Sequence, residues 1–212
     1  MVHSIQLTKT YRYFTYGNLD TAKTIWFVLH GYGQLPEYFI RKFQHLPPED
    51  HFIVAPEGMH RFYLNGTSGR VGASWMTKEA RLQDIEDNIR FLNSLADQFS
   101  AKNAQAKKVL LGFSQGGATA ARWHELGNWQ ANEFILWASV FPPDLELPRD
   151  NSHFSASNNL FLVGTKDEYF STEKTAEITK HLKNAPLNFK CYSYSGNHSV
   201  DPIEIELLAK KL

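Results

Sequence analysis

The 212-residue sequence predicts an α/β fold built on a mostly parallel sheet that is wound with helices on both faces. Three observations support this prediction. Short, unbroken apolar runs such as residues 25–29 are typical of buried parallel strands. Segments with apolar residues at every third or fourth position, such as 80–100, indicate amphipathic helices. The two kinds of segment alternate along the chain, which is the order expected of strands and helices in an α/β sheet.

The composition fits a single globular domain spanning residues 1–212. Twenty-two basic residues balance 22 acidic ones, so the net charge favours neither nucleic acid nor an anionic membrane surface as a partner. The nine histidines lack the spacing of metal ligands, and no phosphate-binding loop is visible, so we expect no metal and no cofactor. The single cysteine, Cys191, is interpreted as a reduced, packed side chain.

The N-terminal residues do not combine a basic segment with a following apolar one, as a signal peptide would. The longest apolar run, 25–29, is far too short to cross a bilayer. We therefore expect a soluble, cytoplasmic protein without integral membrane association. The sequence carries no indication of the oligomeric state.

The first elements are expected in a simple order. Residues 4–16 alternate and are rich in threonine and tyrosine, which predicts an N-terminal strand or hairpin arm. The buried strand Thr24–Leu29 follows. A short helix is expected at 36–46, where two prolines stop it. A second buried strand is expected at 52–55.

The middle of the chain contains the longest expected loop. Residues 57–78 show no periodicity and include four glycines, and a loop of this length in a compact domain is more often functional than idle. An amphipathic helix at 80–100 comes next. The remaining expected elements are strands at 109–111, 133–139, 160–164 and 189–195, helices from residue 118, at 172–184 and at 203–212, and a polar link at 149–159.

A serine between glycines follows the strand at 109–111. The segment 112–116 reads Gly-Phe-Ser-Gln-Gly, and a helix is expected directly after it. Strand, tight turn and helix form the setting of a nucleophile elbow, in which the serine hydroxyl projects above the sheet. Gly112 and Gly116 suit positions where backbones approach too closely for a Cβ atom.

Two further residues follow predicted strands. Asp167 comes just after the strand at 160–164, and His198 just after the strand at 189–195. Functional groups of a wound parallel sheet gather on loops at the carboxyl ends of its strands, so both should converge on Ser114. The chain order Ser, Asp, His is that of the α/β-hydrolase fold.

Each of these residues also has a simpler interpretation. Ser114 fits a glycine-rich turn, Asp167 fits an ordinary turn with Glu168 as a rival acid, and His198 fits a surface loop. Asp201 is better explained as the N-cap of the final helix, which has proline at its first position. The shared register with the strands favours the catalytic interpretation of the first three.

The chemistry explains why these residue types are needed together. A serine hydroxyl is a weak nucleophile at neutral pH, so His198 must accept its proton and return it to the leaving group. Asp167 would hold the correct imidazole tautomer and stabilise the imidazolium.

The oxyanion of the tetrahedral intermediate requires fixed donors. The backbone N–H of Gln115, the residue after the nucleophile, is one candidate. The second is expected in the loop after Thr24–Leu29, where we assign the N–H of Tyr32 with Gly33 as the fallback. His30 precedes this turn and is interpreted as structural.

Four motifs carry a resemblance that covers nearly the whole chain: residues 29–33 (LHGYG), 112–117 (GFSQGG), 164–167 (GTKD) and 196–198 (GNH). In a chain this short, without a separate cap domain, they resemble the phospholipase/carboxylesterase family of α/β hydrolases, which includes acyl-protein thioesterases. Carried over by position, the resemblance implies Ser114, Asp167 and His198 as the triad. It also implies the amides of Tyr32 and Gln115 as the oxyanion hole, and ester or thioester hydrolysis of a small-molecule substrate without a cofactor.

Aromatic residues are candidates for the substrate pocket, although each also suits an ordinary core position. Residues 69–74 depart from the family's usual pattern, which leaves the substrate class open. Arg61 and Arg70, in the expected long loop at 57–78, suit either an anionic substrate group or solvated charges. The candidate pocket walls are Phe62, Tyr63, Trp75, Phe141 and Tyr169.

Two other functions remain open from the sequence. A ligand-binding or sensor protein would keep the hydrolase pocket with little or no turnover. A peptidase or lipase on the same fold would usually require an inserted cap or lid, for which only residues 57–78 leave room.

Overall fold

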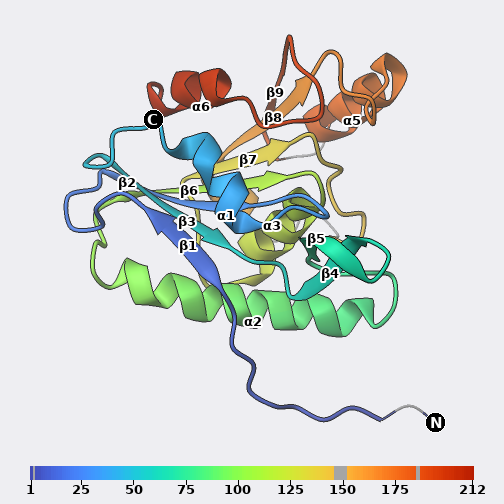
Figure 1. Ribbon diagram of the computed structural model, residues 1–212. Helices are drawn as coiled ribbons and strands as arrows, with labels where there is room; N and C mark the ends of the chain where they lie inside the picture. Colours follow the sequence, from blue (N-terminus) through green and yellow to red (C-terminus); the bar gives the residue numbers. More distant parts are fainter. Residues whose placement is uncertain (2, 146–151, 185–186) are drawn as a thin grey trace.

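The computed structural model describes residues 1, 3–145, 152–184 and 187–212. Its centre is a seven-stranded sheet in the order β1-β3-β2-β6-β7-β8-β9 (Figure 1). All neighbouring strands are parallel except β1, which runs antiparallel to β3 at one edge. The predicted mostly parallel sheet is confirmed. Its strands are β1 (Tyr13–Tyr16), β2 (Thr24–Leu29), β3 (His51–Pro56), β6 (Lys107–Phe113), β7 (Glu133–Trp137), β8 (Asn158–Gly164) and β9 (Phe189–Tyr194).

Helices cover both faces of this sheet. On one face the 3₁₀ helix η1 (Ile40–Phe43), which continues α1 (Pro36–Phe39), contacts the C-terminal helix α6 (Pro202–Ala209). On the other face the long helix α2 (Arg81–Ser100) packs beside α3 (Gln115–Leu126), as Figure 1 shows below the sheet. The short helix α4 (His153–Ala156) contacts α3, and α5 (Thr172–Asn184) packs against β9.

The segment 57–78 differs from its prediction as a long loop. It contains an antiparallel hairpin of β4 (His60–Asn65) and β5 (Ser68–Ser74), which lies outside the main sheet. Most residues of β4 are exposed on both faces, so no apolar alternation marks the strand. Gly66, in the two-residue turn between the strands, has φ of 65°, a value that glycine adopts at no steric cost, and Gly69 near the start of β5 has φ of 85°.

Smaller differences occur at three other places. The N-terminal strand is restricted to β1, and the apolar side chains Ile5 and Leu7 before it are exposed. The helix expected at 36–46 is divided into α1 and η1. Of the polar link at 149–159, residues 149–151 lie outside the described residues.

Aromatic side chains fill much of the core. All five tryptophans are buried, and the rings of Trp123 and Trp129 stack with their centroids 5.2 Å apart. Most of the high aromatic content is therefore used in packing. Among the helices of the described ranges, none is both long and apolar enough to cross a membrane.

Candidate active site

The serine at the carboxyl end of β6 lies on a strained turn. Ser114 has φ of 52°, a left-handed value that residues with a side chain rarely adopt, and α3 begins at the next residue. A Cβ atom on Gly116 would lie 2.4 Å from the carbonyl oxygens of Leu29 and His30. Glycine at this position therefore lets the start of α3 contact the end of β2.

The loops after β8 and β9 bring two side chains to this serine. The Nε2 atom of His198 lies 3.0 Å from the Oγ atom of Ser114, and its Nδ1 atom lies 2.7 Å from Oδ2 of Asp167. The Asp167 side chain is fully buried, and its Oδ1 atom accepts a hydrogen bond from the amide of Tyr169. The neighbouring acid, Glu168, is exposed. The three residues that the motifs singled out thus form one hydrogen-bonded chain.

The loop that carries His198 is fixed from two directions. The hydroxyl of Tyr194 donates to the carbonyl oxygen of Ser199 at 2.6 Å. The Nζ atom of Lys42 donates to the carbonyl oxygen of Val200 at 3.0 Å. Burial is the main cause that raises the pKa of Tyr194 to about 12, so this hydroxyl stays protonated at neutral pH and keeps its hydrogen to donate.

Tyr32 and Gln115, whose amides are the candidate oxyanion donors, line the same hollow as Ser114. Among the described residues, neither the N–H of Tyr32 nor that of Gln115 donates a hydrogen bond to another protein atom. The adjacent amides are occupied, because that of Gly31 donates to Oε1 of Gln34 and that of Gly33 donates to the carbonyl oxygen of Ala73. This pattern favours Tyr32 over the fallback Gly33 as a donor to a ligand.

A hollow of about 460 Å³ opens at the serine. A second hollow of about 520 Å³, between α5 and the segment after β7, shares Val140 and Lys174 with it. The first hollow, at the serine, is lined by Tyr32, Ser114, Gln115, Ala118, Ala138, Ser139, Val140, Tyr169, Phe170, Lys174 and His198.

The predicted pocket walls are placed differently from one another. Tyr169 lines the first hollow, with its ring centroid 4.6 Å from that of His198. Phe141 lines the second hollow instead. Phe62 packs against the ring of Tyr32, and Trp75 is fully buried and lines neither hollow.

Sequence reasoning missed the wall formed by Val140 and Lys174. Val140 follows the carboxyl end of β7, where a wound parallel sheet places functional residues, so its position was a usable signal. Lys174 lies in the first turn of α5 and carries no such signal. Within the ranges that the structure describes, no three or more His, Cys, Asp or Glu side chains gather as a metal site would require.

Comparison with known proteins identifies the family of the chain. The family model described as serine hydrolase (FSH1) matches residues 21–204, a range that includes Ser114, Asp167 and His198. No curated protein sequence matches this chain.

Solved structures of esterases have the same fold. Esterase PE8 superposes with a TM-score of 0.71 at 17% identity, covering 96% of this chain and 99% of its own. Acyl-protein thioesterase 2 of Zea mays has a TM-score of 0.68 at 22% identity, with 94% and 96% covered. A phospholipase/carboxylesterase from Dyadobacter fermentans DSM 18053 has a TM-score of 0.64 at 18% identity, with 97% of each chain covered. The resemblance to serine esterases of the α/β-hydrolase type is confirmed.

Proposed function

The chain belongs to the FSH1 family of serine hydrolases, and on that premise we propose that it cleaves carboxylic esters or thioesters through Ser114, His198 and Asp167. The observation that carries this proposal is the chain of hydrogen bonds from Asp167 Oδ2 through the imidazole of His198 to Ser114 Oγ. Both contacts have lengths suitable for proton transfer and orientation.

In the acylation step, Ser114 Oγ attacks the carbonyl carbon of the substrate while its proton moves to Nε2 of His198. The buried carboxylate of Asp167 keeps the imidazole in the tautomer that can accept this proton and stabilises the imidazolium. The bond from the carbonyl carbon to oxygen or sulfur then breaks, and the imidazolium protonates the departing alcohol or thiol. The product of this step is an acyl-enzyme on Ser114.

In the deacylation step, His198 takes a proton from water as the water attacks the acyl carbonyl. The acid is released, and the proton returns to Ser114. The negative charge on the carbonyl oxygen in both steps is placed against the amides of Tyr32 and Gln115. Protein groups supply every proton transfer, so the reaction as proposed uses no cofactor.

The hollows beside the serine suggest how a substrate is held. The first hollow would take the carbonyl group and the nearest part of the acyl chain, with Tyr169 beside the imidazole. The second hollow adjoins the first at Val140 and is lined mostly by apolar side chains, which include Phe141 and Leu145, together with Lys174, Glu177 and His181. An acyl chain longer than the first hollow would extend into the second.

A series of p-nitrophenyl esters from acetate to palmitate tests the proposal. We expect turnover by the wild-type protein, and loss of at least about a thousandfold in kcat for Ser114→Ala with folding unchanged. The exposed Ser155, on α4, provides the control variant Ser155→Ala, which should keep full activity.

A fluorophosphonate label gives a second measurement on the same proteins. It should react with wild type and with Ser155→Ala but not with Ser114→Ala. Esterase activity that survives in Ser114→Ala would refute the proposed nucleophile. A wild-type protein that neither turns over esters nor takes the label would favour the ligand-binding alternative.

A further inference from the structure

Trp75 lies behind the oxyanion loop, which we define as residues 30–34. Its side chain is fully buried, and its Nε1–H donates to the carbonyl oxygen of His30 at 2.8 Å. Its ring centroid lies 5.1 Å from that of His30. Trp75 is therefore attached to the first residue of the loop that carries the Tyr32 amide, although it lines neither hollow.

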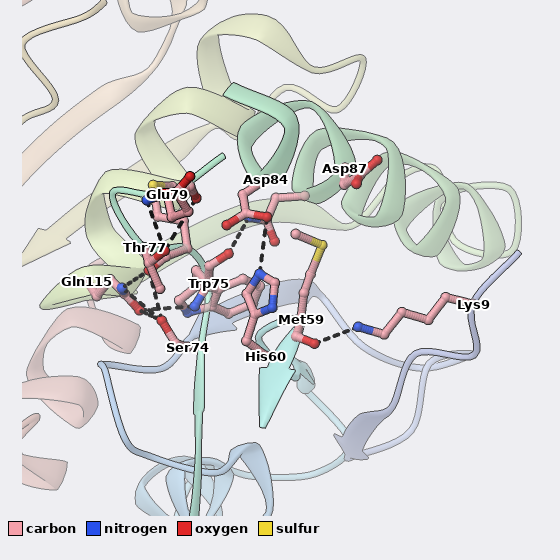
Figure 2. A network of polar contacts seen from close by, with 12 residues as sticks. Lys9, Met59, His60, Ser74, Trp75, Thr77, Glu79, Asp84, Asp87 and Gln115 are labelled. Atoms are coloured by element: carbon pink, nitrogen blue, oxygen red, sulfur yellow. Dashed lines mark hydrogen bonds and ion pairs between the residues drawn. The ribbon is translucent and has the colours of Figure 1, made fainter. Parts of the chain in front are cut away.

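The side chain of Gln115 holds this tryptophan in place. Its Oε1 atom accepts from the backbone N–H of Trp75 at 3.0 Å, and its Nε2 atom donates to the carbonyl oxygen of Met76 at 2.8 Å. Figure 2 shows the Gln115 side chain directed at Ser74 and Trp75 from the neighbouring helix. Gln115 thus provides a free backbone amide at the serine and, through its side chain, anchors the residue that supports the other amide.

The far side of Trp75 is also fixed. The Nδ2 atom of the buried Asn88, on α2, donates to the carbonyl oxygen of Trp75 at 2.9 Å. Trp75 therefore lies between α2 and the oxyanion loop, and both its backbone carbonyl and its ring nitrogen are hydrogen-bonded.

The hairpin adds a backbone connection to the same loop. The amide of Gly33 donates to the carbonyl oxygen of Ala73, and the amide of Ala73 donates to the carbonyl oxygen of Gln34. A Cβ atom on Gly72 would lie 2.4 Å from the carbonyl oxygen of Gly33, so β5 and the loop are in direct contact. These bonds occupy the amide next to Tyr32, while the amide of Tyr32 itself donates to no protein atom among the described residues.

We propose that Trp75 and the side chain of Gln115 are positioning residues that set the separation of the two oxyanion amides. The inference rests on the proposed function, because it assigns these contacts to the stabilisation of the acyl oxyanion. Neither side-chain hydrogen bond reaches the substrate. Both act through the backbone of residues 30–32 and through the elbow at Ser114.

The physical reason is geometric. Donors stabilise the oxyanion when they lie at hydrogen-bond distance from the position that it occupies in the transition state. A shift of about 1 Å in such a group costs about a hundredfold in rate. The neutral carbonyl oxygen of the bound substrate forms weaker hydrogen bonds with these donors than the oxyanion does. The loss of stabilisation therefore appears in kcat more than in KM.

The central variant is Trp75→Phe, which keeps an aromatic ring but removes the donor to His30. Its matched control is Trp123→Phe, which also removes one buried indole hydrogen bond, here to Oδ1 of Asn93, a residue that makes no hydrogen bond to the oxyanion loop among the described residues. Each protein is measured for kcat and KM on a short p-nitrophenyl ester. The inhibition constant of a trifluoromethyl ketone is measured as well, because its adduct with Ser114 places an oxyanion between the two amides.

We expect Trp75→Phe to lower kcat by about tenfold to a hundredfold and to weaken the ketone by a similar factor, with KM within about threefold of wild type. Trp123→Phe should change neither kcat nor the inhibition constant of the ketone by more than about threefold, even if both variants melt at a lower temperature. Equal losses in the two variants, or a Trp75→Phe protein with unchanged ketone affinity, would overturn the inference.

Gln115→Met offers a second route if Trp75→Phe does not fold, since it keeps the backbone amide and the chain length but removes the side-chain hydrogen bonds to Ser74, Trp75 and Met76. It should also lower kcat and ketone affinity together. Because the two residues act in series, the double variant should lose little more than the worse single variant. Fully additive losses would contradict the proposal.

The wild-type measurement separates this inference from the proposed function. Absence of Ser114-dependent turnover in wild type would overturn both. Normal turnover in wild type that persists undiminished in Trp75→Phe and Gln115→Met would overturn only the positioning role.

Discussion

The two sides of Ser114 are held by different kinds of interaction. On one side, the oxyanion loop is fixed by uncharged hydrogen bonds from Trp75, Gln34 and the hairpin, and its supporting side chain is completely buried. On the other side, the segment after β7 forms a wall that includes Val140. That wall is anchored through Asp144, which accepts from Nε of the buried Arg122 at 2.8 Å and from the partly exposed Arg81 at 2.6 Å.

The difference follows from what each side must do. Oxyanion donors require fixed dipoles that do not reorganise during the reaction, and buried neutral hydrogen bonds meet this requirement. The wall has only to exclude water and fit the acyl chain, so its anchor can lie at the surface. We therefore expect damage to the first side to appear in kcat, and damage to the second side to appear in stability and substrate preference.

The largest effect is expected from breaking the anchor of the wall. The hydrogen bonds from Arg122 are the main cause that holds the pKa of Asp144 well below its usual range, so the carboxylate is charged at neutral pH. Asp144→Ala would leave the guanidinium of Arg122 buried without its partner, and removal of one member of a buried pair costs about 3 to 5 kcal/mol. Since the Asp144 side chain is 34% exposed, we expect a loss at the lower end of this range: urea unfolding should show a free energy of unfolding that is lower by about 3 kcal/mol.

The control for this variant is Arg81→Ala, which removes the exposed partner of the same carboxylate. It should change the free energy of unfolding by less than about 1 kcal/mol. Asp144→Ala should keep a kcat near wild type on acetate esters, because the oxyanion loop is untouched. A large fall in kcat on the shortest ester would show that the two sides are not separable.

A second prediction concerns acid and the oxyanion side. Burial lowers the pKa of His30 to about 4. The amide of Gly58 donates to its Nε2 atom, so the neutral ring must donate from Nδ1 to the carbonyl oxygen of Gly31. Below pH 6.5 the unfolded chain binds a proton at this histidine that the folded chain does not. Stability is therefore complete above pH 6.5 and is lost as the pH falls toward 4.

Between pH 8 and pH 5 the loss from His30 should be about 2 kcal/mol. Urea unfolding of His30→Gln should show a pH dependence that is smaller by about this amount. Burial also lowers the pKa of His124 to about 3, so a variant at that residue has a similar effect on stability and serves as the comparison. Only the His30 variant should also lower kcat. A pH dependence that is identical in wild type and His30→Gln would contradict the assignment.

The elements that were predicted correctly are those whose own residues show the hydrophobic pattern of a strand or a helix. The strand β2 is an unbroken apolar run, and α2 shows its buried face in the spacing of its apolar residues. Asp201 accepts from the amide of Ile203 at 2.8 Å, so the predicted N-cap of α6 is confirmed. The hairpin was missed because exposed strands need no apolar alternation.

The candidate site likewise has parts that could be predicted from the local sequence and parts that could not. Ser114, Asp167 and His198 follow the carboxyl ends of parallel strands, so their meeting could be expected from chain order alone. The choice between the amides of Tyr32 and Gly33 could not, because it depends on the pairing of Gly33 with Ala73 in the unpredicted hairpin. For the same reason, nothing in the local pattern shows that the indole of Trp75 reaches His30, 45 residues earlier.

The smallest effect is expected at the junction of the two hollows, where it tests whether the wall sets chain-length preference. Each buried methylene contributes about 0.8 kcal/mol, or about fourfold in kcat/KM, until the acyl chain fills the available space. Val140→Asp would place a carboxylate where both hollows meet. The gain per methylene should then fall toward zero for chains that reach the junction, while acetate turnover stays within about twofold.

Val140→Thr is the matched control, because it keeps the shape of valine and adds only a hydroxyl. For long acyl chains, the kcat/KM of Val140→Thr should lie between the values of wild type and Val140→Asp. For acetate, all three proteins should have similar turnover. The p-nitrophenyl ester series measures all three proteins in one experiment. A fall in kcat/KM that is the same for every chain length would mean that Val140 supports the reacting carbonyl and not the acyl chain. The two sides of Ser114 would then not have the separate roles assigned to them here.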